Sequence, residues 1–564
     1  MTSDSRLHLK NPDRTFPHQA NLPRFDPLEH PYPSRRTTVY AKNGMVATGQ
    51  PLAAQAGLDI LKRGGNAVDA AIATAAALTV VEPTANGIGG DNFAIVWMAH
   101  EGGTGGQLYG MNASGPSPAL LSYEALERRG IREMPRTGWI PVTVPGAPAG
   151  WAALSARFGR LPLKEVLAPA IEYAESGFPL TPALGKFWAA AAKSYRDGLK
   201  GPEFEPWFQT FTPDGRIPGI GEIWRSPGHA RTLRLIAESN ARAFYEGELA
   251  DEIDRFSRET GGLLRKSDLA DFQPQFVDPV HVRYRGVDVW ELPPNGQGIV
   301  ALMALNILNG WELSERETTD SYHLAIEALK LAFAAGKAHI ADPSAMTARL
   351  EDLLSEDYAA AERKRIGWEA LEPTPGTLPA GGTVYLATAD QAGNMVSFIQ
   401  SNYMGFGSGI VVPGTGIALQ NRGHGFSLDK THPNVAAPGK RPYHTIIPGF
   451  LTRDHQAIGP FGVMGGFMQP QGHLQVVMNT VDFHLNPQAA LDAPRWQWMS
   501  GKQVLFEAGV PSHIVQALAR RGHAVSIAAD DGVFGRGEII WRDAASGVLL
   551  GATEPRTDGT VAAW

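Results

Sequence analysis

The chain has no cysteine among its 564 residues, and this absence excludes three kinds of site. Without a thiol there is no cysteine nucleophile, no thiolate metal site and no disulfide framework. A chain of this length builds a stable core without covalent cross-links. The absence of cysteine leaves the cellular compartment open, since reducing and oxidising compartments both contain such proteins.

A long apolar run is also missing. The most apolar segment, Ala67–Val81, is rich in alanine and threonine, contains Asp69 and is too short to span a bilayer. The first ten residues, Met1–Lys10, lack the apolar core of about 7–15 residues that a secretory signal requires. We therefore expect a cytoplasmic protein without membrane contact, or a periplasmic one if a signal has been removed.

Clusters of positive charge are absent as well. Lysine and arginine number 50 against 57 aspartate and glutamate residues, which gives a formal net charge of -7. A mildly acidic chain without a basic patch lacks the electrostatic footprint of a nucleic-acid-binding protein. Hydrophobic residues make up 43% and charged residues 19%, as is typical of a globular chain rather than a disordered one.

The order of helical and strand patterns predicts a layered fold. Six prolines between positions 12 and 33 predict that residues 1–37 form an extended arm. Regular structure is expected from about residue 38, and the last third is rich in strands, as in sheets covered by helices on their outer faces. The predicted helices are 51–61, 67–80, 163–176 and 321–340, and the predicted strands are 92–98, 384–389, 395–401, 409–412 and 417–419.

Several partial motifs are incomplete. Gly462–Gly466 is not followed by the Lys-Ser/Thr of a phosphate loop, and Gly407–Gly409 lacks the spacing of a serine nucleophile elbow. The sequence therefore predicts no cofactor and no metal. The close spacing typical of metal ligands is missing from the histidines of the last third, His424, His432, His444 and His473.

A different chemistry is indicated at Pro379–Tyr385. Gly381 and Gly382 place no Cβ constraint on the backbone before Thr383, so unusual φ/ψ values are accessible there. The Thr383 hydroxyl could attack the Gly382 carbonyl, form an ester and release the upstream chain when water cleaves that ester. Thr383 would then carry a free α-amine with a reference pKa of about 7.7–8.0, suited to act as the base for its own hydroxyl.

On its own, Gly-Gly-Thr is more often a flexible loop that enters a strand. A series of longer blocks, however, resembles the γ-glutamyltranspeptidase family in the same order, from about residue 38 to the end of the chain. The first block is residues 53–96. The others are Leu292–Gly298, Thr383–Asn394, Gly405–Gly409, Lys440–Pro442, Gly465–Gly466, Asp492–Arg495 and Glu554–Arg556.

This resemblance implies an α+β fold, the four-layer αββα sandwich of N-terminal nucleophile hydrolases. It also implies cleavage between Gly382 and Thr383. Residues 38–382 would form a large subunit and residues 383–564 a small one, which gives a heterodimer of the chain's own fragments. Whether such heterodimers associate further is left open.

The resemblance also assigns roles to four residues. It implies that Thr383 is the nucleophile and that Ser401 hydrogen-bonds it; the alternative for Ser401 is a buried serine on a strand. Gly465 and Gly466 match the glycine pair whose backbone N–H groups stabilise the oxyanion of the tetrahedral intermediate. A tight turn at these two glycines is compatible with that role.

The chain departs from the glutamyl-specific members of the family at residues that hold the substrate's α-carboxylate and α-amine. Their arginine after the Gly-Gly-Asp block is Asn112 here, and their asparagine two residues after Ser401 is Tyr403. Their Ser-Ser pair after Lys-Arg-Pro is replaced by His444 and Thr445. These four replacements are expected to line a site of altered polarity.

A further departure lies at Arg422 and Gly425, where the glutamyl site has an acceptor residue and then an aspartate for the ammonium group. Losing the aspartate leaves a substrate ammonium without a partner, and an unpaired charge in a desolvated pocket is costly. Arg422 would instead offer a cation to a carboxylate elsewhere on the acyl group. The alternative for Arg422 is a surface arginine in a glycine-rich turn.

These departures resemble γ-glutamyltransferase-like proteins and cephalosporin acylases of the same family. We therefore expect a self-processing amide hydrolase that cleaves a small amide with a carboxylate-bearing or neutral acyl group and transfers the acyl group mainly to water. One alternative is a true γ-glutamyl transferase or glutathione hydrolase with replaced contacts. Another is a processing-dead scaffold or binding homologue, since the second threonine often found after the nucleophile is Val384 here.

Overall fold

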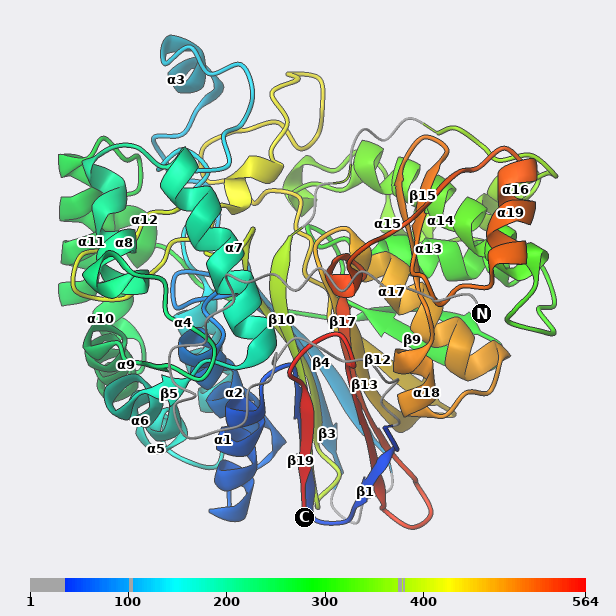
Figure 1. Ribbon diagram of the computed structural model, residues 1–564, viewed down its shortest axis with the longest axis horizontal. Coiled ribbons are helices and arrows are strands. Elements are labelled where there is room, and N and C mark those ends of the chain that lie inside the picture. Colours follow the sequence, from blue (N-terminus) through cyan, green and yellow to red (C-terminus); the bar gives the residue numbers. More distant parts are fainter. Residues whose placement is uncertain (1–35, 101–104, 374–377, 379–380) are drawn as a thin grey trace, which may run out of the picture.

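Two antiparallel sheets lie face to face at the centre of the molecule, and helices cover the outer side of each (Figure 1). This computed structural model describes residues 36–100, 105–373, 378 and 381–564. The extended arm predicted over residues 1–37 therefore lies almost wholly outside the described residues. The arrangement confirms the predicted α+β fold, an αββα sandwich.

The sheet that carries Thr383 has seven strands. In spatial order they are β19 (Thr560–Ala563), β2 (Gly44–Thr48), β10 (Gly382–Asp390), β11 (Met395–Tyr403), β3 (Asp91–Ala99), β4 (Gly106–Ala113) and β7 (Gln275–Val277). The long hairpin β10–β11 thus lies in the middle of the sheet, between β2 and β3. Both of its faces are covered, and its residues from Thr383 to Tyr403 are buried except at the turn.

The opposite sheet also has seven strands. Their order is β1 (Val39–Ala41), β18 (Leu549–Thr553), β17 (Arg536–Arg542), β13 (Gln456–Met464), β12 (Gly449–Arg453), β9 (Val287–Glu291) and β8 (Val280–Tyr284). Apolar side chains from the two sheets meet in a shared core that includes Phe93, Ile399, Tyr385, Phe450 and Ile540. Successive side chains of each strand point to opposite faces of its sheet. One face of each sheet therefore packs in this core, and the other packs against the helices.

The outer side of the β10 sheet is covered by helices, among them an alanine-rich helix, α2 (Ala67–Val81), that packs on β10 and β11. Every residue of α2 is buried, because small side chains let it approach the sheet closely. The other helices on this side, on the left of Figure 1, are α1 (Pro51–Lys62), α4 (Ala147–Phe158), α5 (Leu163–Val166), α6 (Ala168–Ser176), α7 (Pro182–Gly198), α8 (Glu205–Phe211), α9 (Pro227–Ser239), α10 (Arg242–Tyr245), α11 (Glu248–Glu259) and α12 (Lys266–Ala270). A short helix, α3 (Tyr123–Arg128), projects from this side.

The helices on the other outer side pack on β8, β9 and β13. They are α13 (Gly298–Leu308), α14 (Thr319–His339), α15 (Leu350–Leu353), α16 (Glu356–Arg363), α17 (Met468–Val477), α18 (Pro487–Asp492) and α19 (Ser512–Arg520). A small sheet of β14 (Trp496–Ser500), β15 (Gln503–Phe506) and β16 (Ala524–Ile527) lies beside them. No helix in the described part of the chain combines the length and apolar character needed to cross a membrane.

The structure confirms most of the predicted elements and corrects three. The predicted helix 163–176 is two helices, α5 and α6, because Pro169 near the start of α6 has no N–H group to continue the hydrogen-bond ladder. The predicted strands 409–412 and 417–419 are wrong. These segments form only the isolated bridges Val411–Ala418 and Gly89–Leu419, because Gly409, Gly414 and Gly416 adopt positive φ angles of turns.

Candidate active site

Thr383 lies at the beginning of the central hairpin and is fully buried. The register between β10 and β11 shifts between Gly382 and Val384, so Thr383 sits at an irregularity in the ladder. Such a bulge re-aims a side chain that would otherwise follow the alternation of the strand. Gly382 pairs with Tyr403 and Val384 with Gln400, which brings Thr383 opposite Ser401.

The Ser401 hydroxyl connects the two residues of the expected cleavage site. Thr383 Oγ1 donates to Ser401 Oγ at 3.1 Å, and Ser401 Oγ donates to the carbonyl oxygen of Gly382 at 2.7 Å. The backbone N–H of Tyr403 donates to Ser401 Oγ at 2.8 Å, which fixes the hydroxyl in this orientation. A donor on the Gly382 carbonyl polarises the peptide bond that precedes Thr383.

Gly465 and Gly466 follow β13 and precede α17, with φ angles of 132° and 63°. A Cβ atom on Gly381 would lie 3.2 Å from Gly466 Cα, so the glycine pair borders the expected cleavage site. Among the described residues, no acceptor takes the backbone N–H of either Gly465 or Gly466. Free N–H groups beside a carbonyl are the arrangement that an oxyanion requires.

Two glutamines that the sequence analysis did not single out support this geometry. Gln469 Nε2 lies 3.4 Å from Thr383 Oγ1, and its Oε1 accepts from Ile447 N at 2.9 Å. Gln297 Nε2 donates to the carbonyl oxygens of Gly466 at 2.9 Å and Thr445 at 2.7 Å. Gln297 belongs to the block Leu292–Gly298, but nothing in its local pattern indicates this long-range contact.

Arg422 lies next to Ser401 and is fully buried. The alternative that Arg422 is a surface arginine is therefore wrong. Its Nη1 donates to Thr445 Oγ1 at 2.6 Å, and its Nη2 lies 3.4 Å from Ser401 Oγ. The guanidinium carbon lies 4.1 Å from the centre of the Tyr403 ring. Burial lowers the pKa of Arg422 to about 10, so the side chain is a cation at neutral pH.

Asn112 and His444 form hydrogen bonds away from Thr383. Asn112 Nδ2 donates to Asn295 Oδ1 at 2.9 Å, and His444 Nε2 pairs with Asp91 Oδ2 at 3.0 Å. Burial lowers the pKa of His444 well below its ordinary value, so the imidazole is neutral at neutral pH. The structure therefore brings Thr383, Ser401, Tyr403, Arg422 and Thr445 into one hydrogen-bonded group, while Asn112 and His444 belong to a neighbouring one.

A cavity of about 470 Å³ opens beside the expected cleavage site. Both Gly381 and Gly382 line it, so the peptide bond before Thr383 borders a space of substrate size. Other lining residues include Arg136, Tyr195, Gly405 and Asn421. The cavity is on the side of the β10 sheet where α7 and the segment after β11 lie.

Thr383 also lines a second, much smaller cavity of about 10 Å³. Its wall includes Glu82 and Arg536, which form a buried ion pair at 3.0 Å. Burial raises the pKa of Glu82 to about 7, while the nearby Arg536 opposes this shift. A cavity of this size holds about one water molecule.

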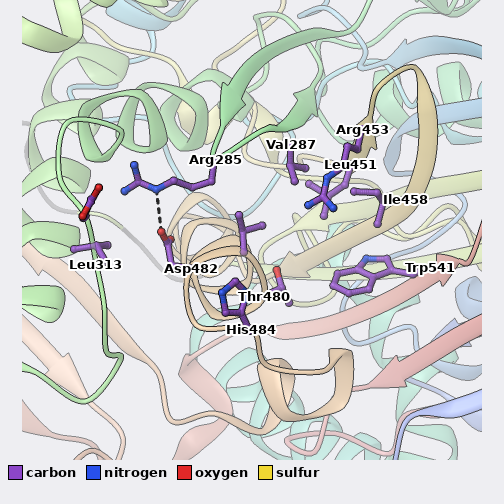
Figure 2. Close-up of a pocket in the computed structure, with 12 residues that line it drawn as sticks. Arg285, Val287, Leu313, Leu451, Arg453, Ile458, Thr480, Asp482, His484 and Trp541 are labelled. Atoms are coloured by element: carbon purple, nitrogen blue, oxygen red, sulfur yellow. Dashed lines mark hydrogen bonds and ion pairs between the residues drawn. The ribbon is translucent and has the colours of Figure 1, made fainter.

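Another cavity, of about 590 Å³, is not lined by any of the predicted residues (Figure 2). Its wall includes Arg285, Asp482, His484 and Trp541, and it is formed by residues of β9, β12, β13, β17 and the π-helix Met478–Asp482 and by loop residues. Arg285 Nε pairs with Asp482 Oδ1 at 3.1 Å, so the positive charge of Arg285 is already neutralised within the protein. The cavity contains none of the residues expected to carry the chemistry.

Three buried side chains far along the chain from Thr383 have ligand atoms within 4.8 Å of one another: His323, Glu327 and His523. Lys330 Nζ donates to Glu327 Oε1 at 2.8 Å, so an internal cation already pairs with this carboxylate. The four histidines considered from the sequence lie apart from this group. Each has a different partner: Met134 O for His424, Lys337 O for His432, Asp91 for His444 and Glu291 for His473.

The geometry around Thr383 agrees with the comparison to known families. The sequence profile described as gamma-glutamyltranspeptidase matches residues 53–564. The chain belongs to the γ-glutamyltranspeptidase family. The resemblance seen in the sequence is thereby confirmed, and the chain is an enzyme of this family.

Relatives within the γ-glutamyltranspeptidase family align over nearly the whole chain. The glutathione hydrolase-like YwrD proenzyme of Bacillus subtilis is 35% identical over 538 residues, which cover 93% of this chain and 98% of that protein. The oxamate amidohydrolase proenzyme of Klebsiella pneumoniae is 33% identical over 536 residues, with coverage of 93% and 98%. A crystal structure of cephalosporin acylase from Bacillus halodurans is 62% identical, with a TM-score of 0.93 and coverage of 96% and 99%.

Proposed function

We propose that this member of the γ-glutamyltranspeptidase family is a self-processing acylase with Thr383 as its nucleophile. The observation that carries the proposal is the position of Ser401, which contacts both the Thr383 hydroxyl and the Gly382 carbonyl oxygen. Relatives named as proenzymes, acylases and an amidohydrolase support the same reaction class. Nucleophile, base and oxyanion donors are all protein groups, so the proposed reaction requires no cofactor.

Self-cleavage begins when Thr383 Oγ1 attacks the Gly382 carbonyl carbon. The hydroxyl proton moves through Ser401 toward the leaving amide nitrogen, the C–N bond breaks, and an ester joins Gly382 to Thr383 Oγ1. Breaking the C–N bond frees the α-amine of Thr383; water then cleaves the ester, leaves a carboxylate on Gly382 and restores the Thr383 hydroxyl. Residues 38–382 become the large subunit and residues 383–564 the small one.

Turnover repeats this chemistry on an external amide. The free α-amine of Thr383, with a reference pKa of about 7.7–8.0, takes the proton of its own hydroxyl as the oxygen attacks the substrate carbonyl. The N–H groups of Gly465 and Gly466 stabilise the tetrahedral oxyanion. The amine product leaves, and water hydrolyses the acyl ester on Thr383 to release the acid.

The substrate in this proposal is not a γ-glutamyl compound. The glutamyl site needs an acidic partner for the substrate ammonium, and Gly425 at that position has no side chain. The buried cation Arg422 instead lies close to the nucleophile's partner Ser401, and it repels an ammonium group. Asn112 is engaged with Asn295, so it does not replace the missing arginine.

Denaturing electrophoresis with intact-mass measurement tests the proposal on freshly purified and then incubated protein. Cleavage before Thr383 divides the 60.6 kDa chain into fragments of about 41 and 20 kDa, with Thr383 at the new amino terminus. The cleaved protein should hydrolyse non-glutamyl anilides faster than γ-glutamyl anilide. A chain that stays intact after long incubation would favour a scaffold role, and rapid turnover of γ-glutamyl anilide would favour a true γ-glutamyl transferase.

A further inference from the structure

We propose that the small cavity beside Thr383 holds the water molecule that cleaves the ester formed in self-processing, and that Glu82 is the base that takes a proton from this water. The inference rests on the self-processing proposed above and names the residues of its second step. It is carried by the cavity of about 10 Å³, whose wall includes the side chains of Glu82, Arg536 and Glu538.

Two buried polar atoms of residues on this wall lack a hydrogen-bond partner among the described residues. They are Arg536 Nε, which is a donor, and Glu538 Oε2. A buried polar atom without a partner costs free energy, whereas a buried water that binds two to four polar groups removes this cost. The volume of about 10 Å³ accommodates about one such molecule. The cavity is therefore suited to one bound water with Arg536 and Glu538 as two of its partners.

The third polar group on the wall is the Glu82 carboxylate, which Arg536 fixes in place. Arg536 Nη1 donates to Glu82 Oε1 at 3.0 Å, and the guanidinium carbon of Arg536 lies 4.3 Å from the centre of the Phe187 ring. Glu82 is buried, with 5% of its surface exposed. The ion pair thus holds a carboxylate at the wall of the water-sized cavity and keeps it away from bulk solvent.

Of the two carboxyl groups on the wall, Glu82 is the one that changes its charge near neutral pH. Burial raises the pKa of Glu82 to about 7; Arg536 opposes this shift and Asp558 adds to it. Burial also raises the pKa of Glu538 well above its ordinary value, so this group is a neutral acid at neutral pH. A general base is most effective when its pKa lies near the working pH. Glu82 therefore fits the role of the base, and Glu538 fits that of a hydrogen-bond partner.

The segment that follows Glu82 packs against the residue that carries the ester carbonyl. A Cβ atom on Gly382 would lie 3.4 Å from Ala85 Cα. The backbone N–H of Ala85 donates to the carbonyl oxygen of Glu82 at 3.4 Å, so a turn holds Glu82 and Ala85 together. The Glu82 segment and the cavity therefore both adjoin the bond between Gly382 and Thr383 in the uncut chain.

The free amine of Thr383 is poorly suited to activate this water. Its reference pKa is about 7.7–8.0, so most of the amine is protonated at neutral pH and cannot take a proton. The unprotonated amine lies beside the new ester and can attack it, which restores the original peptide bond. A separate carboxylate that activates water for attack on the same ester draws the intermediate forward instead.

The proposed step needs one water and no other reactant. The water oxygen attacks the carbonyl carbon of Gly382 while one proton of the water moves to Glu82. The tetrahedral intermediate then collapses, the bond between this carbon and Thr383 Oγ1 breaks, and Glu82 returns the proton to Oγ1. The new carboxylic acid of Gly382 loses its proton to solvent, and Glu82 ends the step ionised, as it began.

Glu82→Gln tests the base, because the amide keeps the shape of the side chain and can accept from Arg536 but cannot take a proton. Formation of the cut chain should be slower by about 10²-fold or more. Added hydroxylamine should restore cleavage, since it attacks the accumulated ester without the help of a base and leaves a hydroxamate on Gly382. Intact mass against time, with and without hydroxylamine, measures both the rate and this product.

Three further variants separate the loss of the base from other effects. Asp482→Asn removes a buried carboxylate that also pairs with an arginine, Arg285 at 3.1 Å, and it should be cut at the parent rate. Ser401→Ala slows the step before the ester forms, so hydroxylamine should not restore its cleavage. Glu82→Asp keeps a carboxylate and should be cut faster than Glu82→Gln.

The inference is overturned if Glu82→Gln is cut at the parent rate, or if its slow cleavage does not respond to hydroxylamine. If Glu82→Gln does not fold, the same comparison on Glu82→Asp decides the question: faster cleavage with hydroxylamine supports the inference, and no response overturns it. In all these cases a parent chain that is cut before Thr383 leaves the proposed function standing, whereas a parent chain that stays uncut contradicts that function itself.

Discussion

Ser401 Oγ donates a hydrogen bond of 2.7 Å to the carbonyl oxygen of Gly382. This is the oxygen that becomes negative when the neighbouring Thr383 hydroxyl attacks, and the same serine accepts that hydroxyl's hydrogen bond at 3.1 Å. One side chain thus contacts the attacking oxygen and the carbonyl that it attacks. In the proposed mechanism, self-cleavage therefore requires Thr383 and is accelerated by Ser401.

Replacing Thr383 with alanine should leave the chain at its full mass and without hydrolytic activity. Alanine has no hydroxyl group, so neither the ester of self-cleavage nor the acyl-enzyme can form. Thr383→Ser keeps a hydroxyl and, once cut, a free amine, so it should retain part of both reactions. Intact-mass measurement over time and an anilide assay follow the two activities.

Thr388→Ala is the matched control for this experiment. Thr388 lies on the same strand, is equally buried, and donates to Ala67 O at 2.7 Å. Its loss should reduce the free energy of unfolding by about 1–3 kcal/mol without preventing cleavage. A Thr383→Ala protein that is cut at the normal position would contradict the proposed nucleophile.

Ser401→Ala should slow self-cleavage by about 10²–10³-fold, as does the loss of one donor to a developing oxyanion. Ser401→Thr keeps the hydroxyl and should be cut faster than the alanine variant. Ser397→Ala is the control, because Ser397 lies on the same strand and bonds Tyr385 OH at 2.8 Å instead. The fraction of cut chain is measured against time; parent-like cleavage of Ser401→Ala would refute the role assigned to this serine.

Gly465→Ala should lower kcat of the cleaved enzyme by about 10-fold or more, with a smaller effect on KM. The φ angle of Gly465 is 132°, and an added Cβ atom would lie 3.2 Å from Gly535 Cα, so the backbone N–H must shift. Gly439→Ala is the control: its φ of 64° is also positive, but its Cβ atom would meet open space. Equal loss of kcat in both variants would argue against an oxyanion role for Gly465.

Lys337 should make stability depend on pH above neutrality. Its Nζ lies 3.7 Å from the centre of the Phe467 ring and 4.8 Å from that of Tyr443, and burial lowers the pKa of Lys337 to about 7. Between this value and the reference pKa of about 10.4, the unfolded chain binds more protons than the folded chain. The free energy of unfolding therefore gains up to about 1.4 kcal/mol per pH unit from this group over that range.

Lys337→Met should remove this contribution and flatten the profile of unfolding free energy between pH 7 and about 10. Urea unfolding at several pH values measures the slope. Lys430→Met is the control, since Lys430 is exposed and also lies over a ring, that of Tyr123, at 4.1 Å. The assignment is wrong if Lys337→Met keeps the slope of the parent protein.

Local patterns predicted those parts of the fold that depend on neighbours in the chain. Helix α2 follows from Asn66 as its cap and from the apolar run that ends before Pro83, and the hairpin β10–β11 from its two runs of strand-forming residues. The segments 409–412 and 417–419 were misassigned because their apolar residues pack in turns set by positive-φ glycines. Packing of a turn against the rest of the molecule is not encoded in its periodicity.

The amino-acid sequence alone determined the chemical groups: a threonine after two glycines, a serine 18 residues later and a glycine pair in the last third. Only the tertiary structure decided how these groups are placed relative to one another. It aligned Thr383 with Ser401 through a strand irregularity and brought in Gln469. It also buried Arg422 without an ion-pair partner among the described residues, and it placed His444 in hydrogen-bond contact with Asp91, 353 residues away. Burial and charge pairing depend on contacts between distant segments, which no local pattern contains.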